Sequence, residues 1–246
     1  MKILALIPAR MGSSRFPGKP MALINGKPMI EHVYERVAKA SSLAMTAVAT
    51  CDQEIVDHIE SIGGIAVMTG DHHERASDRC AEALPLLEAQ FGDEFDIVVM
   101  VQGDEPMTHP DMIDEAVAPM IADQSVQIVN LLGTIDSVEE FEDRNCIKVV
   151  CGTDNTALYF SREPIPTRAK TTEIPMHKQV CIIPFRRSFL FEYSAMEPTP
   201  LEIAESVDMM RVLENGLKVH MVPTKHATNA VDTQADLEKV AKLMAE

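Results

Sequence analysis

The feature that most constrains the fold of this chain is the alternation of apolar runs with amphipathic segments up to about residue 125. Residues 2–8, 44–50 and 95–102 are apolar stretches of strand length, and the segment 29–40 has apolar residues at helical spacing. Strands and helices that alternate in this way form a mostly parallel sheet with helices on both faces. The sequence therefore predicts an α/β fold.

The remaining segments before residue 125 continue the same pattern. Residues 52–64 read as a helix that ends at a glycine pair, and residues 65–68 read as a short strand. A further helix is predicted over 77–90, where Pro85 is expected to kink or split it. Another helix is predicted to start near Pro110.

After about residue 125 the pattern changes to several short apolar segments with little helix between them. Such segments are typical of antiparallel strands, and we expect them to form an arm inserted at about 140–200. Helical patterns return at 201–215 and 233–245. We find no internal repeat and no linker, so we predict a single domain over 1–246 with one insertion.

The charge and cysteine content exclude several classes of protein. A formal net charge of −16 disfavours nucleic acid or an anionic membrane as a partner. The apolar runs are too short to span a membrane or to serve as the core of a signal peptide. The five cysteines form no CxxC pair, which favours free thiols in a reducing compartment. We therefore expect a cytoplasmic protein.

A basic loop interrupts this acidic composition directly after the first predicted strand, in "PARMGSSRFPGKP" at 8–20. It contains no acid, and its basic residues are Arg10, Arg15 and Lys19. Ligands bind at the carboxyl ends of strands in open α/β sheets, and Gly12 and Gly18 let backbone N–H groups approach an anion. The loop therefore predicts a triphosphate site; a solvated basic loop is the alternative.

The loop does not match the common glycine-rich phosphate motifs. In the Walker A motif four residues separate the glycines, and a Ser or Thr follows the lysine. Here Gly12 and Gly18 enclose five residues, and Lys19 is followed by Pro20, which has no hydroxyl for magnesium. The spacing is also not that of the dinucleotide-binding motif. We therefore expect another kind of nucleotide site.

Two aspartates are candidate Mg²⁺ ligands. Asp104 lies just beyond the predicted strand 95–102, after Gly103, at the edge where the basic loop also lies. Magnesium usually takes one or two carboxylates together with phosphate oxygens, so a second acid is expected. Asp232, at the entry of the last predicted helix, is the best candidate, although a charge at a helix terminus would explain it equally.

Four stretches in the same order resemble one known family. They are "IPARMGSSRFPGKPMALINGKPMIEHVYERV", "VQGDEPM", "ALYFSREPIP" and "VDTQADLEKV". Together they resemble the CMP-Kdo synthetase (3-deoxy-manno-octulosonate cytidylyltransferase) family. The resemblance implies a Rossmann-like nucleotidyltransferase domain whose antiparallel arm forms a homodimer. It also implies a Mg²⁺-dependent transfer of CMP from CTP to a 2-keto-3-deoxy sugar acid, with release of pyrophosphate.

The resemblance also assigns roles to individual residues. Those implied to be catalytic are Arg10, Arg15, Lys19, Asp104 and Asp232, and the two aspartates are the implied Mg²⁺ ligands. The implied CTP contacts are Ala9, Arg10, Met11, Gly12, Ser13, Arg15, Lys19, Ser77, Asp78, Arg79, Gln102, Gly103 and Asp104. The implied acceptor contacts are Gln102, Arg162, Gln179, Met209 and Arg211. For Arg162, a salt bridge within the arm is the alternative.

The chain departs from the family pattern where the base and the sugar are recognised. Arg75 and Ala76 replace a Ser-Gly pair, and Gln179 and Met209 replace a His and a Gln. Cys181 and Ile183 also differ from the pattern. A missing hydrogen-bond partner discriminates strongly between substrates, so a phosphonate or another ulosonic acid is an alternative acceptor. A nucleotide-binding protein without catalysis is a further alternative.

A second metal site is not expected from the pair His72–His73 and the following Glu74. Adjacent residues on a loop rarely converge on one ion, and no further His or Cys lies nearby in the sequence.

Overall fold

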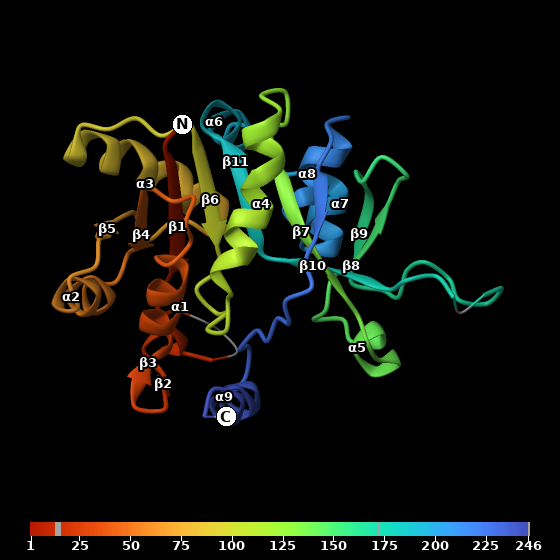
Figure 1. The fold of residues 1–246 in the computed structure, drawn as a ribbon, viewed down its shortest axis with the longest axis horizontal. Helices are drawn as coiled ribbons and strands as arrows, with labels where there is room; N and C mark the ends of the chain where they lie inside the picture. The colour runs from red at the N-terminus through yellow and green to blue at the C-terminus, as the bar shows by residue number, and fades with distance from the viewer. Residues whose placement is uncertain (13–15, 172, 246) are drawn as a thin grey trace.

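The computed structural model describes residues 1–12, 16–171 and 173–245. In this part of the chain a five-stranded sheet has the order β11-β6-β1-β4-β5, as Figure 1 shows. Its strands are β1 (Ile3–Ala9), β4 (Met45–Thr50), β5 (Ala66–Met68), β6 (Ile97–Val101) and β11 (Ile182–Arg186). All neighbours pair in parallel except β11, which runs antiparallel to β6. The predicted α/β fold with a mostly parallel sheet is confirmed.

Helices cover both faces of this first sheet, because alternate residues of its strands point to opposite sides. Leu4 and Leu6 of β1 belong to the apolar cluster of one face. Ile3, Ala5 and Ile7 belong to the cluster of the other face. The helices on the Leu4 side are α3 (Ala76–Phe91), α6 (Arg187–Ser194) and α8 (Met209–Glu214). Those on the Ile3 side are α1 (Met29–Val37), α2 (Gln53–Ser61) and α4 (Pro110–Ala122).

Helix α3 continues through Pro85 as one element, so the sequence prediction of a possible split is wrong. A proline inside a helix removes one backbone hydrogen bond. The buried residues Cys80, Leu84 and Leu87 hold the helix against the sheet on both sides of Pro85. Tertiary packing therefore outweighs the local effect of the proline.

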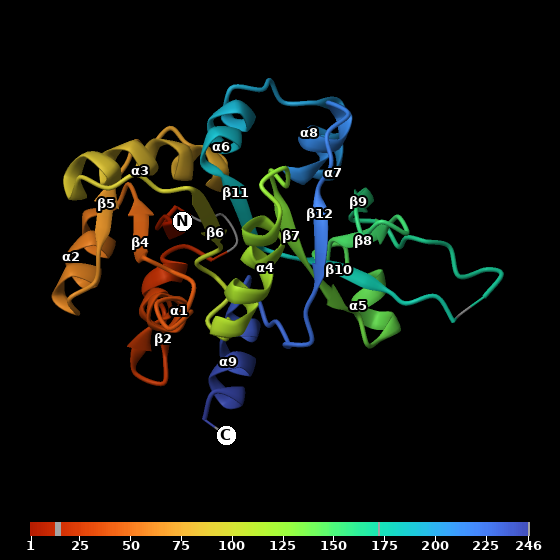
Figure 2. The same cartoon turned by 45° about the horizontal axis from the view of Figure 1, so that its top comes forward.

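A second five-stranded sheet has the order β12-β7-β10-β8-β9. Its strands are β7 (Val129–Thr134), β8 (Lys148–Cys151), β9 (Ala157–Ser161), β10 (His177–Val180) and β12 (His220–Pro223). The arm expected at 140–200 contributes β8, β9 and β10, whereas β7 and β12 come from outside it and pair in parallel, as Figure 2 shows. Strand β11 lies within 140–200 but joins the first sheet. The two sheets are therefore interleaved along the chain.

Several short elements complete the fold. They are the 3₁₀ helix η1 (Lys19–Met21), the strands β2 (Leu23–Ile24) and β3 (Lys27–Pro28), and the helices α5 (Val138–Glu142), α7 (Pro200–Glu205) and α9 (Gln234–Leu243). Neither α5 nor α6 was expected from the sequence. Helix α9 packs through Leu237 and Val240 onto Ile24 and Met29. Among the described residues, no helix is long and apolar enough to cross a membrane. All five cysteines are free thiols, as predicted.

Candidate functional site

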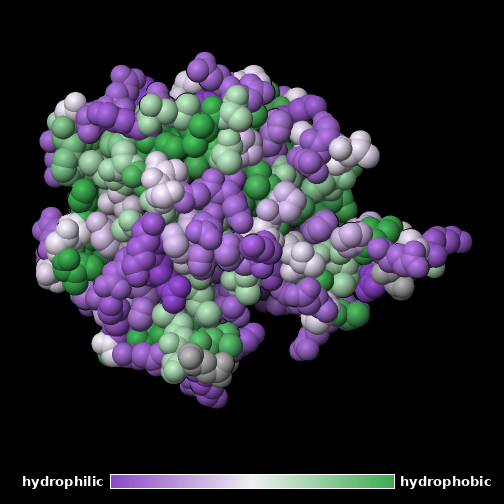
Figure 3. Space-filling view, viewed as in Figure 1, coloured by the Kyte–Doolittle hydropathy of each residue, from purple (hydrophilic) through white to green (hydrophobic). Residues whose placement is uncertain are grey.

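A large cleft lies at the carboxyl ends of β1 and β6 and extends to the second sheet. Its volume is about 1540 Å³. Figure 3 shows hydrophilic side chains gathered over the middle of this face, which is hollowed between α9 and α5. The predicted site residues that line the cleft are Ala9, Arg10, Gly12, Lys19, Gln102, Gly103, Asp104, Arg162, Gln179 and Asp232. The structure therefore brings most of the predicted residues to one cavity.

Lys19 lies between the two aspartates that the sequence predicts as metal ligands. Its Nζ donates hydrogen bonds to Asp104 Oδ2 at 2.8 Å and to Asp232 Oδ1 at 3.4 Å. It also donates to the backbone oxygen of Val231 at 2.8 Å. The Val231 amide in turn donates to the Asp104 carbonyl at 2.9 Å, which joins the two segments. We call Lys19, Asp104 and Asp232 the cleft cluster; it carries two negative charges and one positive charge.

Two glycines bring the cleft cluster together. Gly18 has a φ of 72°, a left-handed conformation that favours glycine, and caps η1, whose first residue is Lys19. A Cβ at Gly103 would lie 3.2 Å from the Pro8 carbonyl oxygen and 3.3 Å from Cδ1 of Ile30. Gly103 therefore allows the chain after β6 to pass close to the end of β1.

Glu105 is a further acid in the cleft that the sequence prediction missed, although it is part of "VQGDEP". Burial raises its pKa to about 8, and the neighbouring charges of Asp104 and Asp232 act in the same direction. Lys178 opposes this rise. The high pKa therefore reflects burial first and the neighbouring negative charge second, and a bound cation would lower it.

The basic loop is described only in part, because Ser13 and Arg15 lie outside the described residues. Arg10 Nη1 donates to the carbonyl oxygen of His73 at 3.3 Å. The Met11 amide donates to Asp52 Oδ2 at 2.8 Å, and the Met11 side chain packs against the core. The loop therefore leaves Arg10 and Lys19 at the cleft.

The residues predicted to contact the base at the start of α3 lie in different surroundings. Arg79 is buried, donates to Thr69 Oγ1 and Gly70 O, and lines a small pocket of about 130 Å³ together with Arg10. Ser77 is fully buried and donates to Asp208 Oδ2 at 3.3 Å. Asp78 Oδ1 accepts a long hydrogen bond from Ser194 Oγ at 3.5 Å. Of the three predicted residues, Arg79 has the position that suits nucleotide binding.

Gln179 and Arg162, which are predicted acceptor contacts, line the cleft with part of their hydrogen-bonding capacity already used. Gln179 Nε2 donates to Asn130 Oδ1 at 2.6 Å. The Arg162 guanidinium donates to the backbone oxygens of Glu205 at 2.7 Å, Arg144 at 3.0 Å and Ser206 at 3.3 Å. Arg162 thus fixes the wall of the cleft through carbonyl groups.

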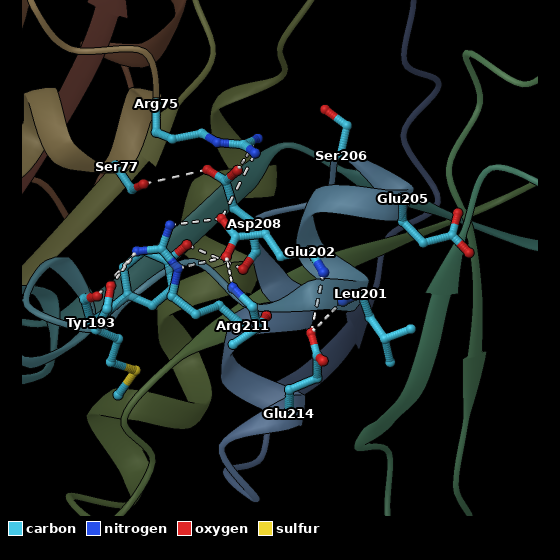
Figure 4. A network of polar contacts seen from close by, with 12 residues as sticks. Arg75, Ser77, Tyr193, Leu201, Glu202, Glu205, Ser206, Asp208, Arg211 and Glu214 are labelled. Atoms are coloured by element: carbon cyan, nitrogen blue, oxygen red, sulfur yellow. Dashed lines mark hydrogen bonds and ion pairs between the residues drawn. The ribbon is translucent and has the colours of Figure 1, made fainter.

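The structure corrects the assignment of Met209 and Arg211 as acceptor contacts. Both are buried in α8, because this helix turns them toward the core of the first sheet. Arg211 donates through Nε and Nη2 to the two oxygens of Glu202, each at 2.7 Å, and its guanidinium lies 4.8 Å from the centre of the Tyr193 ring. Figure 4 shows this pair.

The residue of this stretch that faces the cleft is Asp208, which the sequence prediction missed. Arg75 Nη1 donates to its Oδ1 at 2.8 Å, so a bond spans from the start of α3 to the start of α8 (Figure 4). Burial raises the pKa of Asp208, and Arg75 opposes the rise. We call Arg75, Glu202, Asp208 and Arg211 the buried network.

Comparison with known proteins identifies the family. The family model described as Cytidylyltransferase matches residues 4–219. The chain belongs to the cytidylyltransferase family. The predicted family and the class of enzyme, a nucleotidyltransferase, are therefore confirmed.

This cytidylyltransferase has relatives of nearly the same length. The 3-deoxy-manno-octulosonate cytidylyltransferase of Geobacter metallireducens is 43% identical over 256 aligned positions, which cover 100% of this chain and 98% of the relative. The protein of the same name from Geotalea uraniireducens is 44% identical, with 98% of each chain covered. A solved structure of CMP:2-keto-3-deoxy-manno-octonic acid synthetase complexed with CTP is 39% identical, with a TM-score of 0.90 and coverage of 100% and 99%. The similarity extends over the whole cytidylyltransferase.

Proposed function

We propose that this cytidylyltransferase transfers CMP from CTP to the anomeric hydroxyl of a 2-keto-3-deoxy sugar acid of the Kdo type. The cleft cluster supports this proposal most strongly, because it places two carboxylates and a lysine beside the basic loop at the ends of β1 and β6. The names of the relatives and the CTP in the similar structure support the same two substrates.

We further propose Mg²⁺ as the cofactor, held by Asp104 and Asp232. The residues fit this ion, because carboxylate oxygens are its preferred ligands and the two side chains already share one cation, the Lys19 ammonium. Their charge exceeds that of Lys19, so the cluster has capacity for more positive charge. When bound, Mg²⁺ would neutralise phosphate charge and polarise the α-phosphate.

The residues of the chain then supply binding and orientation. Arg10 and Lys19 bind oxygens of the triphosphate, and Lys19 stabilises the charge that develops on the leaving pyrophosphate. The hydroxyl oxygen of the acceptor attacks the α-phosphorus, the bond from this phosphorus to the bridging oxygen breaks, and the hydroxyl proton passes to solvent. Positioning of two anions in one cleft is the main contribution of the protein.

A different anionic acceptor, such as a phosphonate, is the second candidate. Arg75 favours it, because this guanidinium lines the cleft at a position where the family pattern has Ser. Asp208 holds it in place, and an acidic acceptor would share the guanidinium with that carboxylate. An acceptor with a second acidic group would bind more tightly, because this group could pair with the Arg75 guanidinium.

The test is pyrophosphate release by purified protein with CTP, MgCl₂ and a panel of acidic acceptors. We expect release with Kdo, and omission of Mg²⁺ should abolish it. Release with a phosphonate but not with Kdo would establish the second candidate. CTP binding without release for any acceptor would overturn both and favour a nucleotide-binding protein.

The Arg75→Ser variant sharpens the choice of acceptor. If Kdo is the acceptor, the variant should change the acceptor KM by no more than about tenfold and leave the CTP KM unchanged. A larger loss, seen only with a second acidic acceptor, would favour the alternative.

The homodimer and the cytoplasmic location stay predictions. Strand β9 lies at the edge of the second sheet, and its Leu158 is 63% exposed. An exposed edge strand can pair with another chain, which supports a dimer through β9. Light scattering after size-exclusion chromatography tests it, and a monomer at all concentrations would contradict it.

A further inference from the structure

Beside the cleft, a cluster of imidazoles and carboxylates connects the two segments that carry Asp104 and Asp232. Its members are His109, Asp111, Glu115 and His226. Asp111 and Glu115 are four residues apart on α4, so they lie on the same face of this helix. His226 belongs to the segment between β12 and α9, which leads to Asp232. The cluster therefore lies where two distant parts of the chain meet.

The spacing of three of these side chains is close to that of a metal site. His226 Nε2 lies 3.7 Å from Glu115 Oε1 and 3.9 Å from Asp111 Oδ2. Ligands about 2.0–2.2 Å from a tetrahedral Zn²⁺ lie about 3.3–3.6 Å from one another. A small rotation of each acidic side chain would bring its oxygen to this distance from His226 Nε2. At 3.7 and 3.9 Å the two contacts to Nε2 are too long for direct hydrogen bonds.

Two atoms of the cluster need a partner. His226 Nε2 and Glu115 Oε2 are buried and have no hydrogen-bond partner among the described residues. Buried polar atoms are almost always bonded, so an exception calls for an explanation. A divalent cation between the imidazole and the carboxylates would satisfy both atoms.

His109 orients His226 rather than sharing an ion with it. The two rings stack with centres 4.2 Å apart and planes at 8°. Because lone pairs lie in the ring plane, two parallel rings cannot both point at one ion. His109 Nδ1 also accepts a hydrogen bond from the Asp111 amide at 3.2 Å, which fixes the ring.

We propose that His226 Nε2, Asp111 and Glu115 form a binding site for a divalent transition metal of the Zn²⁺ type. Water completes the coordination, since Asp111 is largely exposed. The two carboxylates balance the charge of the ion, and the imidazole favours Zn²⁺ over Mg²⁺. The ion links α4 to the segment that leads to Asp232 and so holds this segment in place. The proposal does not depend on the identity of the acceptor.

Another cluster in the molecule provides a matched control. Atoms of His72, His73 and Glu82 lie within 4.8 Å of one another. The sequence expectation concerned only a further His or Cys near this pair and did not include Glu82. There, however, His73 Nε2 already contacts Glu82 directly, and the Glu82 oxygens accept from the Gly70 amide. Its polar atoms are therefore partnered, unlike those of His226 and Glu115.

The test uses the full chain, freed of metal by a chelator and kept in excess Mg²⁺ so that the cleft cluster does not compete. Zn²⁺ is titrated by calorimetry, and Co²⁺ by its visible spectrum. We expect one ion per chain and a rise in Tm of about 5–10 °C at a hundredfold excess over Kd. The variants His226→Asn and Glu115→Gln should each weaken binding more than about a hundredfold, whereas His73→Asn should not.

Absence of Zn²⁺ binding, or binding that survives His226→Asn, would overturn the proposal, and so would loss of binding in His73→Asn. If a variant does not fold, ¹⁵N spectra of the wild-type histidines decide. Zn²⁺ must then shift the Nε2 signal of His226 and leave that of His73 in place. An unchanged His226 signal would also overturn the site.

Discussion

The cleft cluster and the buried network are both built from basic and acidic side chains, but they differ in exposure and in charge balance. In the cleft cluster Lys19, Asp104 and Asp232 are 13%, 22% and 28% exposed. In the buried network Arg211 and Glu202 are 4% and 0% exposed and form a bidentate pair, whereas Arg75 and Asp208 are 29% and 19% exposed and line the cleft. The first has one positive charge for two negative charges, whereas the second has two of each.

This difference distinguishes a binding site from a group of residues that stabilises the fold. An exposed cluster with excess negative charge can accept a cation and exchange it, since water still reaches the groups. A buried and balanced network cannot release a partner without leaving a charge unpaired, which is strongly unfavourable. Beside the network, Glu214 of α8 holds the first turn of α7, because the Leu201 and Glu202 amides both donate to it. We therefore expect substitutions in the cleft cluster to affect turnover and those in the Arg211–Glu202 pair to affect stability.

The largest effect is expected for Asp104→Asn and Asp232→Asn. Each should lower kcat by about a thousandfold or more, because charge stabilisation of the phosphoryl group is lost. The Tm should change little, since the cluster is partly exposed and already has an excess of negative charge. Steady-state pyrophosphate release and thermal unfolding measure the two quantities. A rate near that of the wild type in either variant would exclude that aspartate as a metal ligand.

Arg211→Met should have the opposite pattern. Loss of the arginine leaves Glu202 buried without its cation, which should cost about 3–5 kcal/mol of unfolding free energy. The fraction that remains folded should retain the kcat of the wild type, because Arg211 does not reach the cleft. Denaturant unfolding and active-site titration measure this. A stable variant with a low kcat would contradict our correction of the role of Arg211.

The Lys19→Met variant removes the positive charge of the cleft cluster. We expect kcat to fall by about a hundredfold, because one cation that stabilises the leaving group is lost. Stability should fall in the absence of Mg²⁺, because the two carboxylates lose the cation that they share, and saturating Mg²⁺ should restore it. Single-turnover kinetics and Mg²⁺ titrations of the variant check both points. A change confined to KM would show that Lys19 serves binding alone.

The smallest effect is the pH dependence of the buried network. Burial is the largest single influence and would raise the pKa of Glu202. The hydrogen bonds from Arg211 and the Thr199 amide, together with the charges of Arg211 and Arg75, outweigh it and hold the pKa below its ordinary value of 4.5. A lowered pKa in the folded state contributes stability above pH 4.5, and this contribution disappears as the pH falls through the folded pKa. The gap in unfolding free energy between wild type and Glu202→Gln should therefore narrow in acid. A gap independent of pH would contradict this.

The parallel strands of the first sheet could be predicted from the sequence because their signals are local, whereas β11 was expected in the arm. Each buried strand is a short apolar run, and the helices have apolar residues at regular spacing. The second sheet could be predicted only as a group of antiparallel strands. Strand β12 pairs with β7 in parallel across 91 residues of sequence from His220 to Val129, and no local pattern specifies this partner.

What the sequence by itself determined is the parallel part of the first sheet and the kinds of residue at its strand ends, because alternation and turn residues act over a few positions. The tertiary structure alone decided that Lys19 meets Asp232 across 213 residues of sequence and that Asp208, not Arg211, faces the cleft. The physical reason is that the rotation of a short helix such as α8 depends on which side chains the core can accommodate. That choice depends on residues from every layer of the fold at once.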